Sequence, residues 1–321
     1  ASGTQTGSAG VTALNALGTA TAGVVTATAS GTAAELASLT TAGTDLIAVT
    51  LSDAHDLAQL KAINNATGGT ITLNDASVDL NGSAADVSAA LTGISSYTGA
   101  VTLNTAHTLS ELKAINNATG GTITLNDASV ALSGSAADIT AALTGISGYT
   151  GAVTASGTQT GSAGVTAVNA LGTATAGVVT ATVSGTAAEL ASLSTAGTDL
   201  IAVTVSNAHD LAKLKAINNA TGGAITLNDA SVALSGSAAD ITAALAGISG
   251  YTGDVTLTAD HTLAELKAIN NATSGTITLN SYTVALNGSS ADVAAALAGN
   301  FASGYSGTIT LTDAHTLPQL K

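Results

Sequence analysis

Twenty acidic side chains are the first candidates for chemistry in this chain, because carboxylates bind calcium and act as general acids and bases. No EF-hand loop and no glycine-rich calcium-binding nonapeptide occurs among them. Five acids follow expected strands, where Asx turns are common: Asp53, Asp75, Asp127, Asp229 and Asp313. Asp56 and Asp210 stand at expected helix N-caps. Eight more lie three residues after a Ser or Thr, as capping-box partners: Glu35, Asp86, Glu111, Asp138, Glu189, Asp240, Glu265 and Asp292. The acids therefore predict a scaffold with no cofactor, and calcium is the one metal kept as an alternative.

The histidines are the second candidates, and all of them occupy one position, directly before an expected helix N-cap. Consecutive members of this column are separated by about two repeat units, roughly 10 Å by strand stacking. Zinc ligands must converge to about 2.1 Å from the ion, so the spacing disfavours a metal site. We expect each histidine to pack as a hydrophobic staple against a leucine such as Leu60 or Leu112. No Ser or Cys nucleophile motif accompanies them, so the sequence predicts a protein that is not an enzyme. The column consists of His55, His107, His209, His261 and His315.

Thr and Tyr side chains form the candidate binding face. T-x-T pairs recur in expected strands with their side chains directed outward, and tyrosines recur at the turn that leaves a helix. A sugar ring could stack on the tyrosines, although a packing role at the turn is the simpler reading. The Thr ranks resemble those of ice-binding solenoids, but Thr is also a common exposed strand residue, and Ala100 and Ala224 interrupt the rank. The candidate residues are Thr70, Thr72, Thr122, Thr124, Thr276, Thr278, Thr308 and Thr310, with Tyr97, Tyr149, Tyr251 and Tyr305.

Composition excludes several function classes. The chain carries 20 acids against 6 basic residues, a net charge of −14, which argues against binding nucleic acid or anionic membrane. No apolar run approaches the length of a membrane span, so membrane insertion is not expected. Cysteine is absent, and a single Phe among 45% hydrophobic residues indicates a thin, regular core. The chain starts without Met or a signal peptide, which predicts a mature or excised piece of a longer chain. Its acidic, sparsely charged composition, rich in Thr, Gly and Asn, is typical of a secreted bacterial protein.

The elements that position these residues belong to a long internal repeat. Residues 1–10 recur identically at 155–164, and the match continues, so 1–154 and 155–308 are near-duplicate blocks of a single solenoid over 1–321, with 309–321 beginning a further partial block. Within each block, expected N-caps follow one another at spacings of 24, 24, 27, 25, 27 and 27 residues. About thirteen strand–helix coils result. The expected caps are at 8, 32, 56, 83, 108, 135, 162, 186, 210, 237, 262, 289 and 316.

Each coil contains one amphipathic helix and one strand. Leu109, Leu112 and Ile115 lie on one helical face, and Ile123 and Leu125 alternate with Thr in the strand that follows. We expect an α/β solenoid with one continuous parallel sheet, curved or twisted because strands and helices stack at different spacings. The 27-residue coils carry an extra segment such as 77–80, which predicts a short second strand. Asn-Asn pairs such as 64–65 should form side-chain ladders, and the lysines should lie on the solvated helix face.

Two resemblances follow from these motifs. The architecture resembles leucine-rich repeats, and Ile71-Thr72-Leu73-Asn74 is similar to part of their signature, whose remainder is absent. Units such as 30–36 and 255–258 resemble repeats of large type I-secreted adhesins and surface-layer-like chains of cyanobacteria and proteobacteria. This second resemblance implies an extracellular or cell-surface location.

The repeat and the second resemblance together imply an extracellular structural or adhesive segment. We expect stacked coils to form a rod, filament, sheath or surface layer, in which the partners are the chain itself, end to end or within a longer chain, and cell-surface polysaccharide. The alternative is a solenoid that binds carbohydrate, calcium or ice on its Thr-rich face.

Overall fold

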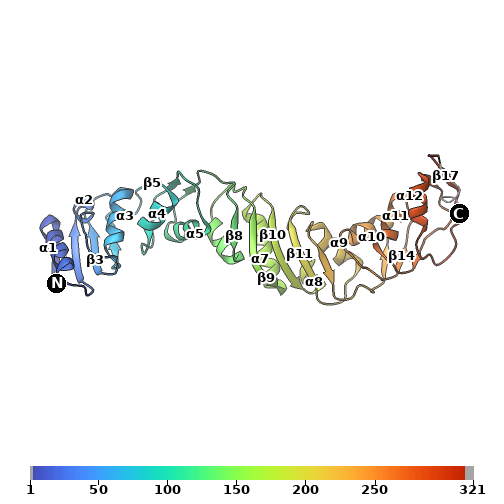
Figure 1. Ribbon diagram of the computed structural model, residues 1–321, viewed down its shortest axis with the longest axis horizontal. Helices are drawn as coiled ribbons and strands as arrows, with labels where there is room; N and C mark the ends of the chain where they lie inside the picture. The colour runs from blue at the N-terminus through green and yellow to red at the C-terminus, as the bar shows by residue number, and fades with distance from the viewer. Residues whose placement is uncertain (1–2, 315–321) are drawn as a thin grey trace. The chain divides into compact units, whose positions relative to one another are not determined.

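The computed structural model describes residues 3–314 and divides them into two compact α/β units. Unit 1 comprises residues 3–153 and 174–177, and unit 2 comprises 154–173 and 178–314. The division falls next to the boundary between the duplicated blocks. Within each unit, short helices and short strands alternate along the chain (Figure 1).

The elements of unit 1 follow the expected strand–helix order. They are β1 (Thr4–Thr6), α1 (Gly7–Ala20), β2 (Thr26–Gly31), α2 (Ala33–Leu36), β3 (Leu46–Leu51), α3 (Leu57–Ala66), β4 (Ile71–Thr72), β5 (Leu80–Gly82), α4 (Ala84–Leu91), β6 (Val101–Leu103), α5 (Leu109–Ala118), β7 (Ile123–Thr124), β8 (Leu132–Gly134) and α6 (Ala136–Leu143).

Unit 2 repeats this order. Its elements are β9 (Val153–Thr160), α7 (Gly161–Ala174), β10 (Val179–Gly185), α8 (Ala187–Leu190), β11 (Leu200–Val205), α9 (Leu211–Asn219), β12 (Ile225–Leu227), β13 (Leu234–Gly236), α10 (Ala238–Leu245), β14 (Val255–Leu257), α11 (Leu263–Ala272), β15 (Ile277–Thr278), β16 (Leu286–Gly288), α12 (Ser290–Leu297) and β17 (Ile309–Leu311).

Most helices begin where the sequence predicts. Ten expected N-cap side chains accept a hydrogen bond from the backbone N–H three residues later, which satisfies one of the free donors of the first turn. The expected caps at Ser8 and Ser162 are wrong. Helix α1 begins at Gly7, and Ser8 instead donates from its N–H and Oγ to Glu35 Oε1, at 3.2 and 3.0 Å. The cap expected at Thr316 lies outside the described residues. The confirmed caps are Thr32, Asp56, Ser83, Thr108, Ser135, Thr186, Asp210, Ser237, Thr262 and Ser289.

The strands form several sheets rather than the one continuous sheet expected. In unit 1 the hydrogen-bonded orders are β1-β2-β3-β4 and β5-β6-β7, all parallel. The break falls in the 27-residue coil that begins at Asp56, which contains two short strands as expected, although the second begins only at Leu80, the last residue of the expected segment 77–80. There β4 pairs backward with β3 while β5 pairs forward with β6, and residues 73–79 between them pair in neither ladder. The extra strand therefore starts a new sheet instead of widening the old one.

Unit 2 has the same interruptions. Its strands run in the orders β9-β10-β11-β12, β13-β14-β15 and β16-β17. The pairs whose register is defined, from β10 onward, are parallel. The first two orders end at coils that carry two short strands, β12 with β13 and β15 with β16.

Strand register places the core on the helix-covered side of each sheet. Val49 pairs with Ile71 and Val101 with Ile123, so apolar side chains stack in rows from coil to coil. Leu60 and Ile63 of α3 meet this row from the helix side and are fully buried. Each coil thus buries its apolar stripe against its neighbours, as in other repeat proteins.

Buried threonines tie each coil to the one before it. Thr67, directly after α3, accepts hydrogen bonds from the Ile47 and Gly69 N–H groups at 2.9 Å and lies 2.8 Å from the Ile47 carbonyl, to which its hydroxyl donates. It is 3% exposed. One hydroxyl thus serves the backbone groups of two coils.

Replacing Thr67 by Val should destabilise unit 1 by about 1–3 kcal/mol, because the buried Ile47 N–H and the partly buried Gly69 N–H lose their acceptor. The matched control is Thr72→Val on the exposed outer face, which should change the free energy of unfolding by less than about 0.5 kcal/mol. Urea denaturation of both variants measures this difference. Equal stability of the two variants would contradict the assigned role of Thr67.

Candidate binding face and buried histidine–tyrosine pairs

The outward sheet surface carries an ordered rank of hydroxyl and amide side chains. Thr50 pairs with Thr72, and Ser30 pairs with Thr50. In the separate sheet β5-β6-β7, Asn81, Thr102 and Thr124 form a second rank of the same kind. Ser and Asn therefore extend ranks that the T-x-T pattern alone had not revealed. In a neighbouring rank Ala48 stands beside Thr28, so that rank is interrupted.

Most of the candidate threonines are accessible on this surface. Thr70, Thr72, Thr122, Thr124, Thr308 and Thr310 are exposed, while Thr276 and Thr278 are half-buried. Such a surface can exchange hydrogen bonds with water or with sugar hydroxyls.

The tyrosines do not belong to this face. Tyr97, Tyr149 and Tyr251 are 0%, 2% and 1% exposed, and Tyr305 is half-buried. Each hydroxyl donates to a backbone carbonyl of the preceding coil, those of Val78, Val130, Val232 and Val284 respectively. Burial raises the pKa of Tyr97, Tyr149 and Tyr251 to about 12. A sugar cannot stack on rings covered in this way, so the packing role is the correct one for these three.

Each described histidine packs against a tyrosine from a later coil. The ring centroids of His55 and Tyr97, and of His107 and Tyr149, lie 6.1 and 6.2 Å apart. His209 and Tyr251, and His261 and Tyr305, repeat the contact at 6.3 and 6.1 Å. The first three pairs share a separation of 42 residues along the chain, and this was the signal available in the sequence. His261 and Tyr305 are 44 residues apart. His315 lies outside the described residues.

The histidine rings are buried without full hydrogen bonding. They are only 4–6% exposed. Neither ring nitrogen of His107, His209 or His261 has a partner, and in His55 only Nε2 contacts a polar atom, Tyr97 Oη at 3.4 Å. Burial lowers the pKa of all four imidazoles against the opposing effect of nearby carboxylates such as Asp75 and Asp127. The site holds a neutral ring and disfavours a charged one.

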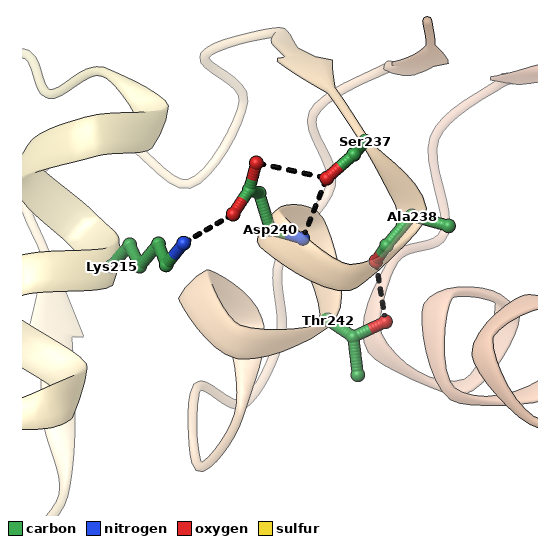
Figure 2. Close-up of polar contacts among 5 residues, drawn as sticks. All are labelled: Lys215, Ser237, Ala238, Asp240 and Thr242. Atoms are coloured by element: carbon green, nitrogen blue, oxygen red, sulfur yellow. Dashed lines mark hydrogen bonds and ion pairs between the residues drawn. The ribbon is translucent and has the colours of Figure 1, made fainter. Parts of the chain in front are cut away.

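Carboxylate side chains make hydrogen bonds and ion pairs between coils more often than they complete capping boxes. Glu35, Glu111, Glu189 and Glu265 complete their boxes. The four Asp partners do not return a bond to the N-cap backbone, since Asp has one methylene fewer. Their carboxylates instead pair with a lysine one coil earlier, as Asp240 does with Lys215 while also bonding Ser237 (Figure 2). The other pairs are Lys61–Asp86, Lys113–Asp138 and Lys267–Asp292.

These ion pairs revise the role expected for the lysines. Their side chains are about 40% exposed and bonded, rather than free on a solvated face. Hydrogen bonds to its carboxylate, first from Lys61 and then from Ser83, hold the pKa of Asp86 below its usual range. Lys113 and Ser135 lower the pKa of Asp138 in the same way. Pairs this exposed contribute little net stability, on the order of 0–1 kcal/mol each.

The acids after strands fall into two groups. Asp75, Asp127 and Asp229 form the expected Asx turns, accepting from the N–H and Oγ two residues later. Asp53 and Asp313 do not. They accept the first N–H of α2 and of α12, from Ala33 and Ser290, both at 2.7 Å. These two carboxylates therefore cap the helix of the preceding coil.

The Asn-Asn pairs do not form side-chain ladders. Asn64 Nδ2 donates to the carbonyls of Ala90 and Thr92 at the end of α4, at 3.0 and 2.6 Å. Asn116 does the same with Ala142 and Thr144. The last carbonyls of a helix have no partner within it, and these amides supply one from the preceding coil. The second Asn of each pair is exposed and makes no side-chain hydrogen bond in the described structure.

Within residues 3–314, no group of three or more His, Asp or Glu side chains is arranged to hold a metal ion. None of the described helices is both long and apolar enough to cross a membrane. No protein-family model matches the chain, and neither a curated protein nor a solved structure matches it.

Proposed function

We propose that this chain is an extracellular structural or adhesive segment that forms a rod, filament, sheath or surface layer through coil stacking. The observation that carries the proposal is the use made of its polar residues. Lys61, Asp86 and Asn64 all bond between neighbouring coils, and so does Asp53. Lys and Asp side chains, which serve as catalytic groups in many enzymes, here form ion pairs and hydrogen bonds between neighbouring coils.

The partner in this proposal is the chain itself, end to end or within a longer polypeptide. Stacked repeats bury each apolar face only against a neighbour, so the same contacts can extend from one molecule to the next. Cell-surface polysaccharide is the second proposed partner, at the hydroxyl-bearing outer face.

Sedimentation velocity over a concentration series, combined with electron microscopy, tests the structural function. The 321-residue chain should form linear assemblies that lengthen with concentration. A monomer that persists at the highest concentration would overturn the proposal of self-assembly.

A ligand-binding function for the Thr-rich outer face is the second candidate, favoured by the paired outward residues Thr50 and Thr72 in one sheet and Thr102 and Thr124 in another. Its ligands would be carbohydrate, ice or calcium, tested by glycan binding, by thermal hysteresis and by calcium-dependent melting. Thr102→Lys should abolish binding at this face while leaving assembly intact. Ala114→Lys, exposed on α5, is the matched control that should affect neither.

A further inference from the structure

The second asparagine of each Asn-Asn pair makes no side-chain hydrogen bond in the described structure, unlike the first, which bonds to the next helix. These second asparagines are Asn65, Asn117, Asn219 and Asn271. All four are exposed. Asn has a poor helix propensity, yet each of these residues is within the last two of its helix. Packing and hydrogen bonding thus leave the residue type unexplained.

Each of these asparagines begins the triplet Asn-Ala-Thr. We propose that they are sites of N-linked glycosylation, for which Asn-x-Ser/Thr is the acceptor pattern. In this reaction the Asn amide nitrogen bonds to the anomeric carbon of a sugar supplied as a glycosyl diphosphate. The bond from that carbon to the phosphate oxygen breaks, the diphosphate leaves with the electron pair, and the amide loses one proton. The proposal rests on the extracellular location within the proposed function.

The folded structure dictates when the sugar is attached. The Thr of each triplet is buried: Thr67, Thr119, Thr221 and Thr273 are 3%, 8%, 4% and 7% exposed. Their hydroxyls are bonded to carbonyls of the preceding coil, as Thr119 is to Gly99 at 3.0 Å. A transferase that reads the Thr hydroxyl cannot reach it after folding. Modification therefore precedes folding, and the exposed Asn side chain leaves the attached sugar in solvent.

The surface around Asn65 has room for an attached sugar. Asn65 borders an open surface hollow of about 390 Å³ shared with Gly68, Ala89 and Thr92. Its neighbour Asn64 is the internal comparison, because Asn64 is bonded to α4 and is followed by Asn-Ala rather than by x-Thr. Two further triplets of the same type, Asn81-Gly82-Ser83 and Asn287-Gly288-Ser289, present exposed asparagines on the outer sheet surface.

Site-resolved mass spectrometry of the chain isolated from the cells that make it tests the proposal. Sugar mass should be found on Asn65, Asn117, Asn219 or Asn271, and never on the first Asn of each pair. Asn65→Gln should remove the sugar from that site, whereas Asn64→Gln should retain it. Unmodified asparagine at all four positions would overturn the proposal.

A second experiment tests the order of events. Unmodified chain is incubated, either folded or held unfolded in urea and then diluted, with a transferase that reads Asn-x-Ser/Thr and its glycosyl diphosphate donor. Only the unfolded sample should be modified, and equal modification of folded chain would overturn the ordering. Sedimentation of the unmodified chain reports assembly separately, so failure of the glycosylation proposal and failure of the proposed structural function are distinguishable.

Discussion

Gly121→Ala should destabilise unit 1 by about 3 kcal/mol, near the upper end of the effect of forcing added atoms into a packed site. A Cβ placed on Gly121 would lie 2.6 Å from the Gly99 carbonyl carbon and 2.7 Å from the Thr98 oxygen, and closer still to the Gly99 oxygen. Those atoms are backbone of the preceding coil, so no side chain can move to make room. The coils must separate locally, which also weakens the bond from Thr119 to Gly99.

Gly120→Ala is the matched control in the same turn. A Cβ there has only the Tyr97 carbonyl oxygen near it, at 3.9 Å, and the residue is exposed. Its backbone is outside the left-handed region, so Ala should be neutral or stabilise slightly by restricting the unfolded chain. Urea denaturation gives the midpoints, and amide hydrogen exchange in β6 and β7 locates the opening. Similar midpoints for the two variants would refute close coil contact at Gly121.

Acidification from pH 7 to pH 5 should destabilise both units through their buried histidines. Burial holds the folded pKa of His55, His107, His209 and His261 below the ordinary 6.5. Below pH 6.5 these histidines therefore bind protons in the unfolded chain but stay neutral in the folded chain. The free energy of unfolding falls with pH until the folded pKa is reached. The slope is at most about 1.4 kcal/mol per pH unit for each such histidine. Melting temperature measured across this range reports the loss.

His107→Leu should remove one site's share of this pH dependence, since Leu fills the space beside Tyr149 without titrating. Asp127 and Glu111 are the charged groups that act on His107, and both oppose its lowered pKa. Asp138→Asn is the control, because the folded pKa of Asp138 is lowered from 3.8 and its contribution is lost only as pH falls through the acid range below that. A wild-type melting temperature that stays constant from pH 7 to pH 5 would contradict the prediction.

Local chemistry made much of the fold predictable. Ten of the N-caps follow from Ser, Thr or Asp placed three residues before a residue whose N–H needs an acceptor, a relation contained within one turn of chain. A short second strand is present where one was expected, but it is displaced: β5 begins at Leu80, the last residue of the expected segment 77–80. Ser8 departs from the pattern because its partner Glu35 comes from another coil.

The partners of the candidate functional residues could not be predicted in this way. The period-two pattern correctly places Thr72 outward, but that Ser30 joins its rank, and that Asn81 pairs with Thr102, depends on register between coils. Tyr97 has the sequence environment of an exposed turn residue. Its burial follows from the coil before it, which supplies the Val78 carbonyl, and from His55 two helices earlier.

By itself, the sequence determined the α/β class, the coil lengths, most helix starts and the alternation of apolar and Thr side chains, because each depends on neighbours a few residues apart. Only the tertiary structure decided that the sheet is interrupted, that Asp86 bonds Lys61, and that His and Tyr side chains share a buried contact. Those features join residues roughly one or two coils apart. How the coils stack determines whether two such groups meet. Stacking in turn depends on residues such as Gly121, whose backbone lies close to the backbone of the preceding coil.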